Sequence, residues 1–323
     1  MLAVYADHAN PADPLSALRV GQQPSPVVPP GHLRVKISHA SLNRHDILTL
    51  CGVTAHAEGI RYPMILGNDG AGTLDDGTPV VLYPVLGTDD WRNDETLDPH
   101  WHILSEFVPG TFADYIVVPE RNVIPLPNGF SPITASVLGT AWLTAYRALF
   151  TRSALRPGET LLVQGASGGM ATALIQLGRA AGFEVWVTSR SEEGRKLAQR
   201  IGAHRTFASN EVLPRKVQAV VDNIGPATWA HSIASLARGG TIVVTGGITG
   251  LEVPINIIPM LSEQFTIAGS IMGTLSDMKN LIHFVAKAGI NPEIGQILPM
   301  EEAQEGFHAM CAGKVRGKTV FTR

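Results

Sequence analysis

The sequence predicts an α/β fold with two domains, a β-rich one followed by a doubly wound parallel-sheet domain, and a short return to the first. The length of 323 residues is ample for two domains. Residues 1–135 contain short β-type runs separated by Gly and Pro, whereas residues 136–274 alternate apolar strands with helical patterns. Such alternation is typical of a parallel sheet covered by helices on both faces. We therefore assign residues 1–135 and 275–323 to the first domain and 136–274 to the second.

The first domain is built on β-type runs such as Leu33–Ile37, Pro79–Tyr83 and Tyr115–Val118. In Leu33–Ile37, apolar and polar residues alternate, as they do in a strand with one buried face. Turn signals, including Pro29–Gly31 and Asp75–Gly77, separate the runs. This pattern indicates a small barrel or sandwich.

In the second domain we expect strands and helices in alternation. The strands are Thr160–Val163, Glu184–Thr188, Ala219–Asp222 and Thr241–Thr245. The helices are Ile133–Phe150, Met170–Ala181, Glu192–Ile201 and Thr228–Ala237. Past Gly273 the pattern predicts two further helices and a last strand, at Ser276–Ala288, Glu301–Cys311 and Lys318–Phe321.

Composition narrows the class of protein. Apolar residues make up 45% of the chain and charged residues 16%, so a large core can form and disorder is not expected. The 25 basic and 28 acidic residues give a net charge of −3, which argues against a nucleic-acid partner. Two cysteines exclude a disulfide framework and a four-thiolate zinc site. The N-terminal residues lack a signal-peptide pattern and no apolar run reaches membrane-spanning length, so we expect a cytoplasmic protein without a membrane partner.

A glycine-rich turn, Gly165–Ala171, stands between a predicted strand and a predicted helix. Gly168 and Gly169 allow the backbone to approach a pyrophosphate, and the helix N-terminus then binds the anion. The small Ala171 permits close packing of helix and strand. We expect Ser167, Gly168, Gly169 and Met170 to bind a dinucleotide, although a purely structural turn is the alternative.

The same turn also matches a hydrolase pattern. Gly165, Ser167 and Gly169 fit the nucleophile elbow, which likewise lies between a strand and a helix. A hydrolase would need an acid and a histidine later in the chain, and Asp222 with His283 or His308 could serve. This alternative leaves the separate β-rich domain without a purpose.

The end of the second strand of this domain indicates which dinucleotide binds. NAD enzymes tend to carry an acid there for the ribose hydroxyl. Here the segment contains Ser189 and Arg190, with Arg195 one helical turn further on. A hydroxyl and guanidinium groups suit a 2′-phosphate, so we expect NADP rather than NAD.

Motifs along nearly the whole chain resemble those of one known family. They are Ser41–Asp46, Leu66–Gly72, Gly110–Pro119, Thr140–Tyr146, Arg156–Gly158, Gly165–Ala171, Leu236–Gly240 and Gly317–Val320. In this order they resemble the medium-chain dehydrogenase/reductase superfamily, in particular its zinc-less, quinone-oxidoreductase-like branch. The resemblance implies a GroES-like catalytic domain and a Rossmann cofactor domain.

The resemblance also implies that no metal is bound. Zinc-dependent relatives have a cysteine at the position of Asn43 and a histidine at that of Asn68, and asparagine is a poor zinc ligand. The stretch Gly87–Trp101 lacks the four cysteines of their structural zinc lobe. His100 and His102 lie in an acidic loop that we interpret as solvated.

Further roles follow from the family pattern. Asp46 matches an acid near the reaction centre, His45 a proton-relay position, and Arg44 a contact to the cofactor pyrophosphate. We therefore nominate Asn43, His45, Asp46 and Asn68 as catalytic candidates, although a structural histidine is the alternative for His45. Asp69 replaces a family glutamate. Leu48 and Leu50 replace a tyrosine and an arginine that are frequent in quinone reductases, which weakens the case for a quinone.

The nicotinamide should lie at the ends of consecutive strands. The residues expected there are Asn223, Gly246, Gly247, Ser270, Met272 and Gly273. Trp142 is either a pocket wall or a core residue. We expect an NADPH-dependent, zinc-independent reductase whose small-molecule substrate is a quinone, an enone or another activated carbonyl. The alternatives are a zinc-type alcohol dehydrogenase and a non-catalytic NADPH-binding protein. Relatives pair through an edge strand, here near Phe265–Ser270, so we expect a homodimer.

Overall fold

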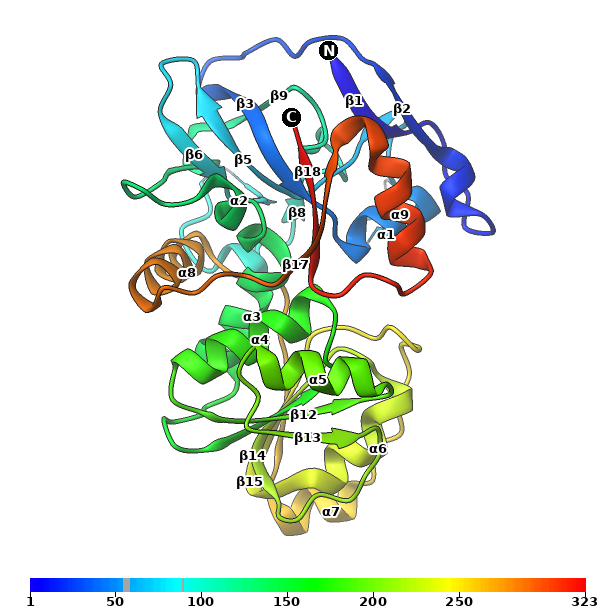
Figure 1. Cartoon of the computed structure of the whole chain (residues 1–323), viewed down its shortest axis with the longest axis vertical. Helices are drawn as coiled ribbons and strands as arrows, with labels where there is room; N and C mark the ends of the chain where they lie inside the picture. Colours follow the sequence, from blue (N-terminus) through cyan, green and yellow to red (C-terminus); the bar gives the residue numbers. More distant parts are fainter. Residues whose placement is uncertain (55–58, 89) are drawn as a thin grey trace. The chain divides into compact units, whose positions relative to one another are not determined.

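The computed structural model describes residues 1–54, 59–88 and 90–323, which form two compact units (Figure 1). Unit 1 comprises Met1–Ala141, Gly273–Ala286 and Ile294–Arg323. Unit 2 comprises Trp142–Met272 and Lys287–Glu293. Each unit has its own sheets and its own apolar core.

Unit 1 is dominated by a seven-stranded sheet. Its strands run in the order β10 (Val123–Pro125), β6 (Pro79–Leu82), β5 (Asp69–Leu74), β3 (His32–Ser41), β18 (Lys318–Thr322) and β17 (Ile294–Pro299), with β9 (Tyr115–Pro119) also paired to β3. Thus β18, from the C-terminal end of the chain, lies against β3 from near its beginning (Figure 1). A Cβ on Gly72 would lie 1.9 Å from the Lys36 carbonyl oxygen, so only glycine lets β5 approach β3 there.

Smaller elements complete unit 1. A three-stranded sheet has the order β2 (Leu18–Gln22), β1 (Leu2–Ala6) and β4 (Met64–Ile65), and a two-stranded one pairs β7 (Val85–Leu86) with β8 (His102–Ile103). The helices are α1 (Arg44–Cys51), α2 (Pro132–Ala135), most of α8 (Leu275–Ala288) and α9 (Ala303–Cys311), with short 3₁₀ turns at Pro14–Ala17, Glu95–Leu97, Glu120–Asn122 and Met300–Glu302. Phe112, Phe307 and Phe321 pack against one another in the core, where edge-to-face and stacked rings are favourable.

Unit 2 contains a six-stranded sheet in which every pairing is parallel. The strand order is β13 (Arg205–Ala208), β12 (Glu184–Ser189), β11 (Thr160–Gln164), β14 (Val217–Asp222), β15 (Leu236–Val244) and β16 (Thr266–Gly269). The helices are α3 (Leu143–Arg147), α4 (Gly169–Ala180), α5 (Glu192–Arg200), α6 (Pro226–Ser235) and α7 (Ile257–Glu263), with a π-type turn at Ala148–Arg152 after α3. The π-type turn before α3, Leu138–Trp142, belongs to unit 1 except for Trp142. The order reverses between β11 and β14, which is the switch point where doubly wound sheets bind ligands.

The predicted fold class is confirmed, with differences at several elements. The continuous helix predicted over Ile133–Phe150 is wrong, because α2 ends at Ala135 and a separate helical stretch begins at Leu138. The helix predicted to end at Ala237 ends at Ser235, since Leu236 already begins β15. Most of the short strands of unit 1 were not foreseen, because two- or three-residue strands carry no periodicity. None of the helices within the described ranges combines the length and the apolar character needed to cross a bilayer.

Candidate functional site

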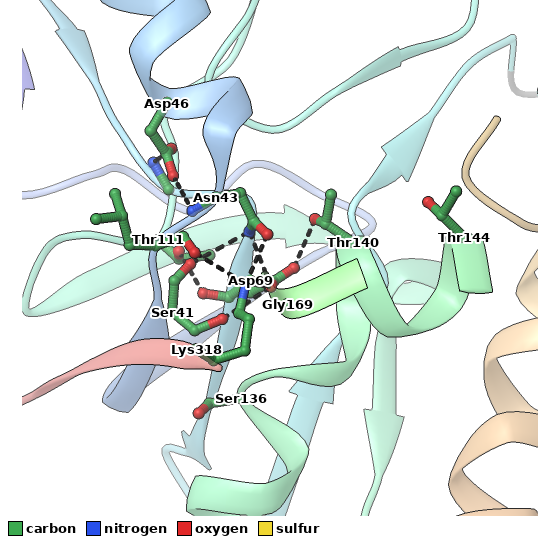
Figure 2. Close-up of polar contacts among 12 residues, drawn as sticks. Ser41, Asn43, Asp46, Asp69, Thr111, Ser136, Thr140, Thr144, Gly169 and Lys318 are labelled. Atoms are coloured by element: carbon green, nitrogen blue, oxygen red, sulfur yellow. Dashed lines mark hydrogen bonds and ion pairs between the residues drawn. The ribbon is translucent and has the colours of Figure 1, made fainter. Parts of the chain in front are cut away.

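A buried polar cluster in unit 1 surrounds the Asp69 carboxylate, which is completely shielded from solvent (Figure 2). We call Ser41, Asn43, Asp69, Thr140 and Lys318 the Asp69 cluster. Oδ2 of Asp69 accepts hydrogen bonds from Ser41 Oγ at 2.8 Å and Asn43 Nδ2 at 2.9 Å, and forms an ion pair with Lys318 Nζ at 3.2 Å. Oδ1 accepts one from Thr140 Oγ1 at 2.6 Å. The cluster thus joins the end of β3, the starts of β5 and β18, and the helical stretch at Leu138–Trp142.

Lys318 holds the Asn43 side chain in one orientation. Its ammonium group, on a side chain only 3% exposed, donates to the Leu42 carbonyl at 2.9 Å and to Asn43 Oδ1 at 2.6 Å, besides its contact with Asp69. The three N–H donors of a lysine therefore have three acceptors. Asn43 Nδ2 donates to Asp69 and, at 3.3 Å, to the Ser41 carbonyl, so both of its hydrogens are also used.

Asp46 has a structural position at the start of α1. Its Oδ2 accepts from the Asn43 backbone N–H at 2.8 Å, and its Oδ1 accepts from the Gly67 N–H at 2.8 Å. Complete burial raises the pKa of the Asp46 carboxyl to about 6, although the Asn43 hydrogen bond and the neighbouring His45 oppose this rise. Both oxygens are committed to the backbone, which leaves Asp46 poorly placed to react with a substrate.

His45 and Asn68 each retain one buried polar atom without a partner among the described residues. His45 Nε2 lies 3.2 Å from Glu106 Oε1, while its Nδ1 has no partner. Asn68 donates through Nδ2 to the Leu104 carbonyl, while its Oδ1 has no partner. Burying an unpaired polar atom is costly, so these two atoms are the natural candidates to meet a bound molecule.

Three further residues of unit 1 were singled out in the sequence: Arg44, Gly273 and His102. Arg44 is exposed, and its guanidinium has no hydrogen-bond or ion-pair partner in the described part of the chain. Gly273, expected at the nicotinamide, belongs to unit 1 and accepts a hydrogen bond from the Tyr83 hydroxyl at 2.8 Å. His102 Nδ1 lies 3.2 Å from the His100 carbonyl oxygen. Within residues 1–54, 59–88 and 90–323, no three His, Cys, Asp or Glu side chains form a group that could hold a metal ion.

In unit 2 the glycine-rich turn ends β11 and begins α4. Gly168 is the exposed N-cap residue of α4, with φ −80° and ψ 165° and no side-chain cap. A Cβ at Gly168 would touch nothing within 4 Å, so open space lies over the turn. The first internal bond of the helix runs from the Thr172 N–H to the Gly168 carbonyl at 3.0 Å. The N–H groups before it, at Gly169 and Met170, remain available to an anion.

Arg190 follows the end of β12 and is exposed, with no ion-pair partner in the described ranges. Ser189 is buried, and its carbonyl accepts a hydrogen bond from Arg195 Nη1 at 3.1 Å. The two arginines therefore differ: Arg195 hydrogen-bonds the backbone, whereas Arg190 has no ion-pair partner among the described residues. A free guanidinium at this strand end fits a phosphate group on the ribose.

The predicted nicotinamide residues of unit 2 lie at the carboxyl ends of neighbouring strands. Asn223 follows β14, Gly246 and Gly247 follow β15, and Ser270 follows β16. The Ser270 hydroxyl has no partner among the described residues. Met272 is buried and its sulfur lies 3.9 Å from Thr144 Oγ1. Trp142 is a core residue with no exposed surface, which settles the two interpretations of it.

A second buried polar network surrounds Asp222, the last residue of β14. Asp222 accepts hydrogen bonds from the Ile224 and Gly225 N–H groups and from the hydroxyls of Thr228 and Ser232. No histidine within the described ranges contacts its carboxylate, so Asp222 lacks the partner that the nucleophile-elbow alternative requires.

Sequence reasoning nominated neither Lys318 nor Glu106 for the site. Lys318 appears in the sequence only as part of a family motif, and a lysine at the start of a strand is usually exposed, so nothing in the sequence signals its burial. Glu106 carried no signal, because its partner His45 is 61 residues away in sequence.

Comparisons with known proteins match one family profile to unit 1 and a second one mainly to unit 2. The family profile described as alcohol dehydrogenase GroES-like domain matches residues 29–128, and the profile described as zinc-binding dehydrogenase matches residues 169–287. An alcohol dehydrogenase of Geobacillus stearothermophilus is 29% identical over 334 aligned positions, which cover 94% of this chain and 95% of that protein.

Two further relatives have other names. The quinone oxidoreductase of Mus musculus is 30% identical over 232 positions, covering 66% of this chain and 68% of that protein. An acryloyl-coenzyme A reductase of Metallosphaera sedula is 27% identical, covering 94% and 96%. A crystal structure of an NAD-dependent alcohol dehydrogenase superposes with a TM-score of 0.92 at 29% identity, and covers all of both chains. The chain therefore belongs to the medium-chain dehydrogenase/reductase superfamily of oxidoreductases.

Proposed function

We propose that this oxidoreductase is an NADPH-dependent, zinc-independent reductase of activated carbonyl compounds: an enone, a quinone or a similar acceptor. The observation that carries the proposal is the contact between Lys318 Nζ and Asn43 Oδ1 at 2.6 Å. A buried ammonium therefore occupies the lone-pair side of a residue whose position holds a zinc-binding cysteine in the zinc-dependent relatives. A cation at this distance opposes the binding of a second cation.

The choice of NADPH is supported by Arg190. Its exposed guanidinium lies at the end of β12, where an acid would favour the ribose hydroxyls of NAD. Gly169 and Met170, in the first turn of α4, offer N–H groups without a described partner to the pyrophosphate. When bound, NADPH supplies the hydride that the reaction needs.

The choice of substrate follows from the absence of metal ligands at Asn43 and Asn68. Without a Lewis acid, the carbonyl must be activated by hydrogen bonds and by its own electron sink, as in an enone. Asn68 Oδ1, an acceptor without a described partner, can orient an N–H or O–H group of the bound molecule, and His45 retains Nδ1 for proton delivery to the substrate.

The test is an NADPH-oxidation screen over enones, quinones and simple aldehydes, with and without a chelator, together with a zinc determination. We expect reduction of enones or quinones, no effect of the chelator, and well under one zinc per chain. Stoichiometric zinc that survives the chelator would restore the zinc-type alcohol dehydrogenase. NADPH binding without any turnover would instead indicate a non-catalytic NADPH-binding protein.

We also propose that two copies pair through β16. This strand ends the order of the unit 2 sheet and hydrogen-bonds only β15 among the described strands. Exposed apolar side chains gather in the segments next to it, at Leu251, Ile255, Ile257, Ile258, Leu261 and Ile271. Burial of such an edge against its own copy removes unpaired backbone groups and apolar surface from water. Sedimentation at micromolar concentration should give twice the 34.5 kDa of one chain, and a monomer would contradict the proposal.

A further inference from the structure

Residues 103–106 of unit 1 contact two of the nominated side chains. The Leu104 carbonyl accepts the hydrogen bond of Asn68, and the Glu106 carboxylate contacts His45 Nε2. Between them, Ser105 adopts the left-handed conformation with φ 72°, which is uncommon for a residue with a side chain. Its carbonyl accepts from Thr49 Oγ1 at 3.3 Å, so the segment is tied to α1. This short segment therefore fixes both groups from one side.

The Glu106 side chain is 8% exposed and is itself well held. Its Oε2 accepts from the Ile103 N–H at 2.9 Å, and its Oε1 from Thr54 Oγ1 at 3.4 Å as well as from His45. Asp46, on the same helix as His45, has both oxygens engaged by the backbone. Within the described ranges, Glu106 is therefore the carboxylate that can hold the His45 ring.

The chemistry of this contact decides which nitrogen of His45 carries the proton. A carboxylate only accepts hydrogen bonds, so Nε2 must be the N–H nitrogen in the neutral ring. Nδ1 is then the nitrogen that binds and releases a proton, and this atom is buried without a described partner. We propose that Glu106 is a positioning residue, which fixes this tautomer and the orientation of the ring, so that Nδ1 is the nitrogen that delivers a proton to the reduced substrate.

The proton step rests on the proposed function and balances as follows. Addition of the hydride to the enone converts NADPH to NADP⁺ and gives a substrate enolate. The Nδ1–H bond of protonated His45 breaks, its electron pair stays on Nδ1, and the proton forms a C–H or O–H bond on the enolate. Neutral His45 keeps its Nε2–H bond to Glu106, and a proton from water restores the cation.

The decisive variant is Glu106→Gln, which keeps the shape of the side chain. In this variant the carboxamide oxygen must face the Ile103 N–H in order to accept its hydrogen bond, so the NH₂ group faces His45 Nε2. Because NH₂ is a donor, Nε2 must then be an acceptor, and the ring proton moves to Nδ1. We expect kcat to fall about 100-fold or more, with the KM for NADPH unchanged. Glu106→Asp, which retains the charge, should recover part of kcat. The matched control is Glu120→Gln, an exposed glutamate of the same unit, which should leave kcat unchanged.

A double variant separates positioning from general damage to the fold. In a His45→Gln background, Glu106→Gln should cause no further loss of kcat, because its effect passes through His45. ¹⁵N NMR of the histidine rings should assign Nε2–H to His45 in the wild type and not in Glu106→Gln. Additive losses, an unchanged kcat in Glu106→Gln, or an Nδ1–H wild-type ring would each overturn the inference. A wild type that reduces nothing in the screen overturns the proposed function itself, and is seen before any variant is made.

Discussion

Asp69 in unit 1 and Asp222 in unit 2 are buried carboxylates of almost equal exposure, 0% and 1%, with different kinds of partners. Asp69 is surrounded by an ammonium group, an amide and two hydroxyls. Asp222 is surrounded by two backbone N–H groups and two hydroxyls, and no cation among the described residues contacts it. A buried charge has lost its hydration, and the two sites replace that hydration in different ways.

The two carboxylates also differ in how far away in sequence their hydrogen-bond donors lie. The donors of Asp222 lie within ten residues of it, so local turns bring them in place. The donors of Asp69 come from as far away as Lys318, 249 residues along the chain. Both carboxylates accept hydrogen bonds from neutral donors, but among the described residues only Asp69 also has a cation in contact, Lys318. Removal of a single partner should therefore cost more at Asp69 than at Asp222.

The largest effect is expected for Lys318→Met. The change leaves Asp69 buried without a cation, and breaking a buried pair in this way costs about 3–5 kcal/mol. Urea unfolding of the purified variants measures the loss. The double variant Lys318→Met with Asp69→Asn removes both charges and should recover most of the stability. A loss of under about 1 kcal/mol for Lys318→Met would show that the ion pair is not what distinguishes the Asp69 cluster.

Asp46 sharpens the comparison, because it is a buried carboxyl held by backbone N–H groups in unit 1. Burial raises its pKa from 3.8 to about 6, so the folded state binds its proton more tightly than the unfolded state. Its contribution to the free energy of unfolding is therefore largest below pH 3.8 and declines as the pH rises to about 6, by about 3 kcal/mol in all.

The measurement compares unfolding of the wild type and Asp46→Asn from pH 4 to pH 7. Their difference in the free energy of unfolding should change with pH in this direction. The exposed control Asp13→Asn should show no such change. A pH-independent difference for Asp46→Asn would mean that the two N–H donors alone compensate the charge, as the neutral donors do at Asp222.

Arg190→Ala tests a charged side chain that, unlike the three buried carboxylates, is exposed and is proposed to bind the cofactor. A charge-assisted contact to the 2′-phosphate contributes roughly 1.5–3 kcal/mol, so the Kd for NADPH should rise about 10- to 150-fold. The Kd for NADH should hardly change, and the effect should shrink at high salt because the site is open to solvent. Calorimetric titration of both cofactors, with Lys196→Ala as the exposed control, decides the matter. Equal weakening of both cofactors would make Arg190 structural.

The smallest effect is expected for Ser232→Ala in unit 2. It removes one hydroxyl from Asp222, while two N–H groups and Thr228 remain. The variant loses the hydroxyl's hydrogen bond to Asp222 and the one that it accepts from Gln164 Nε2, which still contacts His231. The free energy of unfolding should fall by about 1–2 kcal/mol, measured by urea unfolding. A loss as large as that of Lys318→Met would remove the distinction between the two carboxylates.

Local and long-range contacts also explain why the sequence predicted the elements of unit 2 better than those of unit 1. In unit 2 the strands β11, β12 and β14 and the helices α4 and α5 were predicted within two residues, because each is a continuous apolar or periodic segment. The order of these elements also placed the glycine turn before α4 and Arg190 after β12. In unit 1 the two-residue strands β4, β7 and β8 were missed, since their pairing depends on partners far away in sequence.

The sequence by itself therefore determined the fold class, the family and the residue types at Asn43, Asn68 and Arg190. Only the tertiary structure decided which of these side chains keep a polar atom without a described hydrogen-bond partner. Lys318 and Asp69 occupy the amide of Asn43, whereas Asn68 and His45 keep an atom without a described partner. The physical reason is that periodicity and motifs report contacts within one segment, while a buried ion pair or a fixed histidine tautomer needs groups that only folding brings within hydrogen-bond distance.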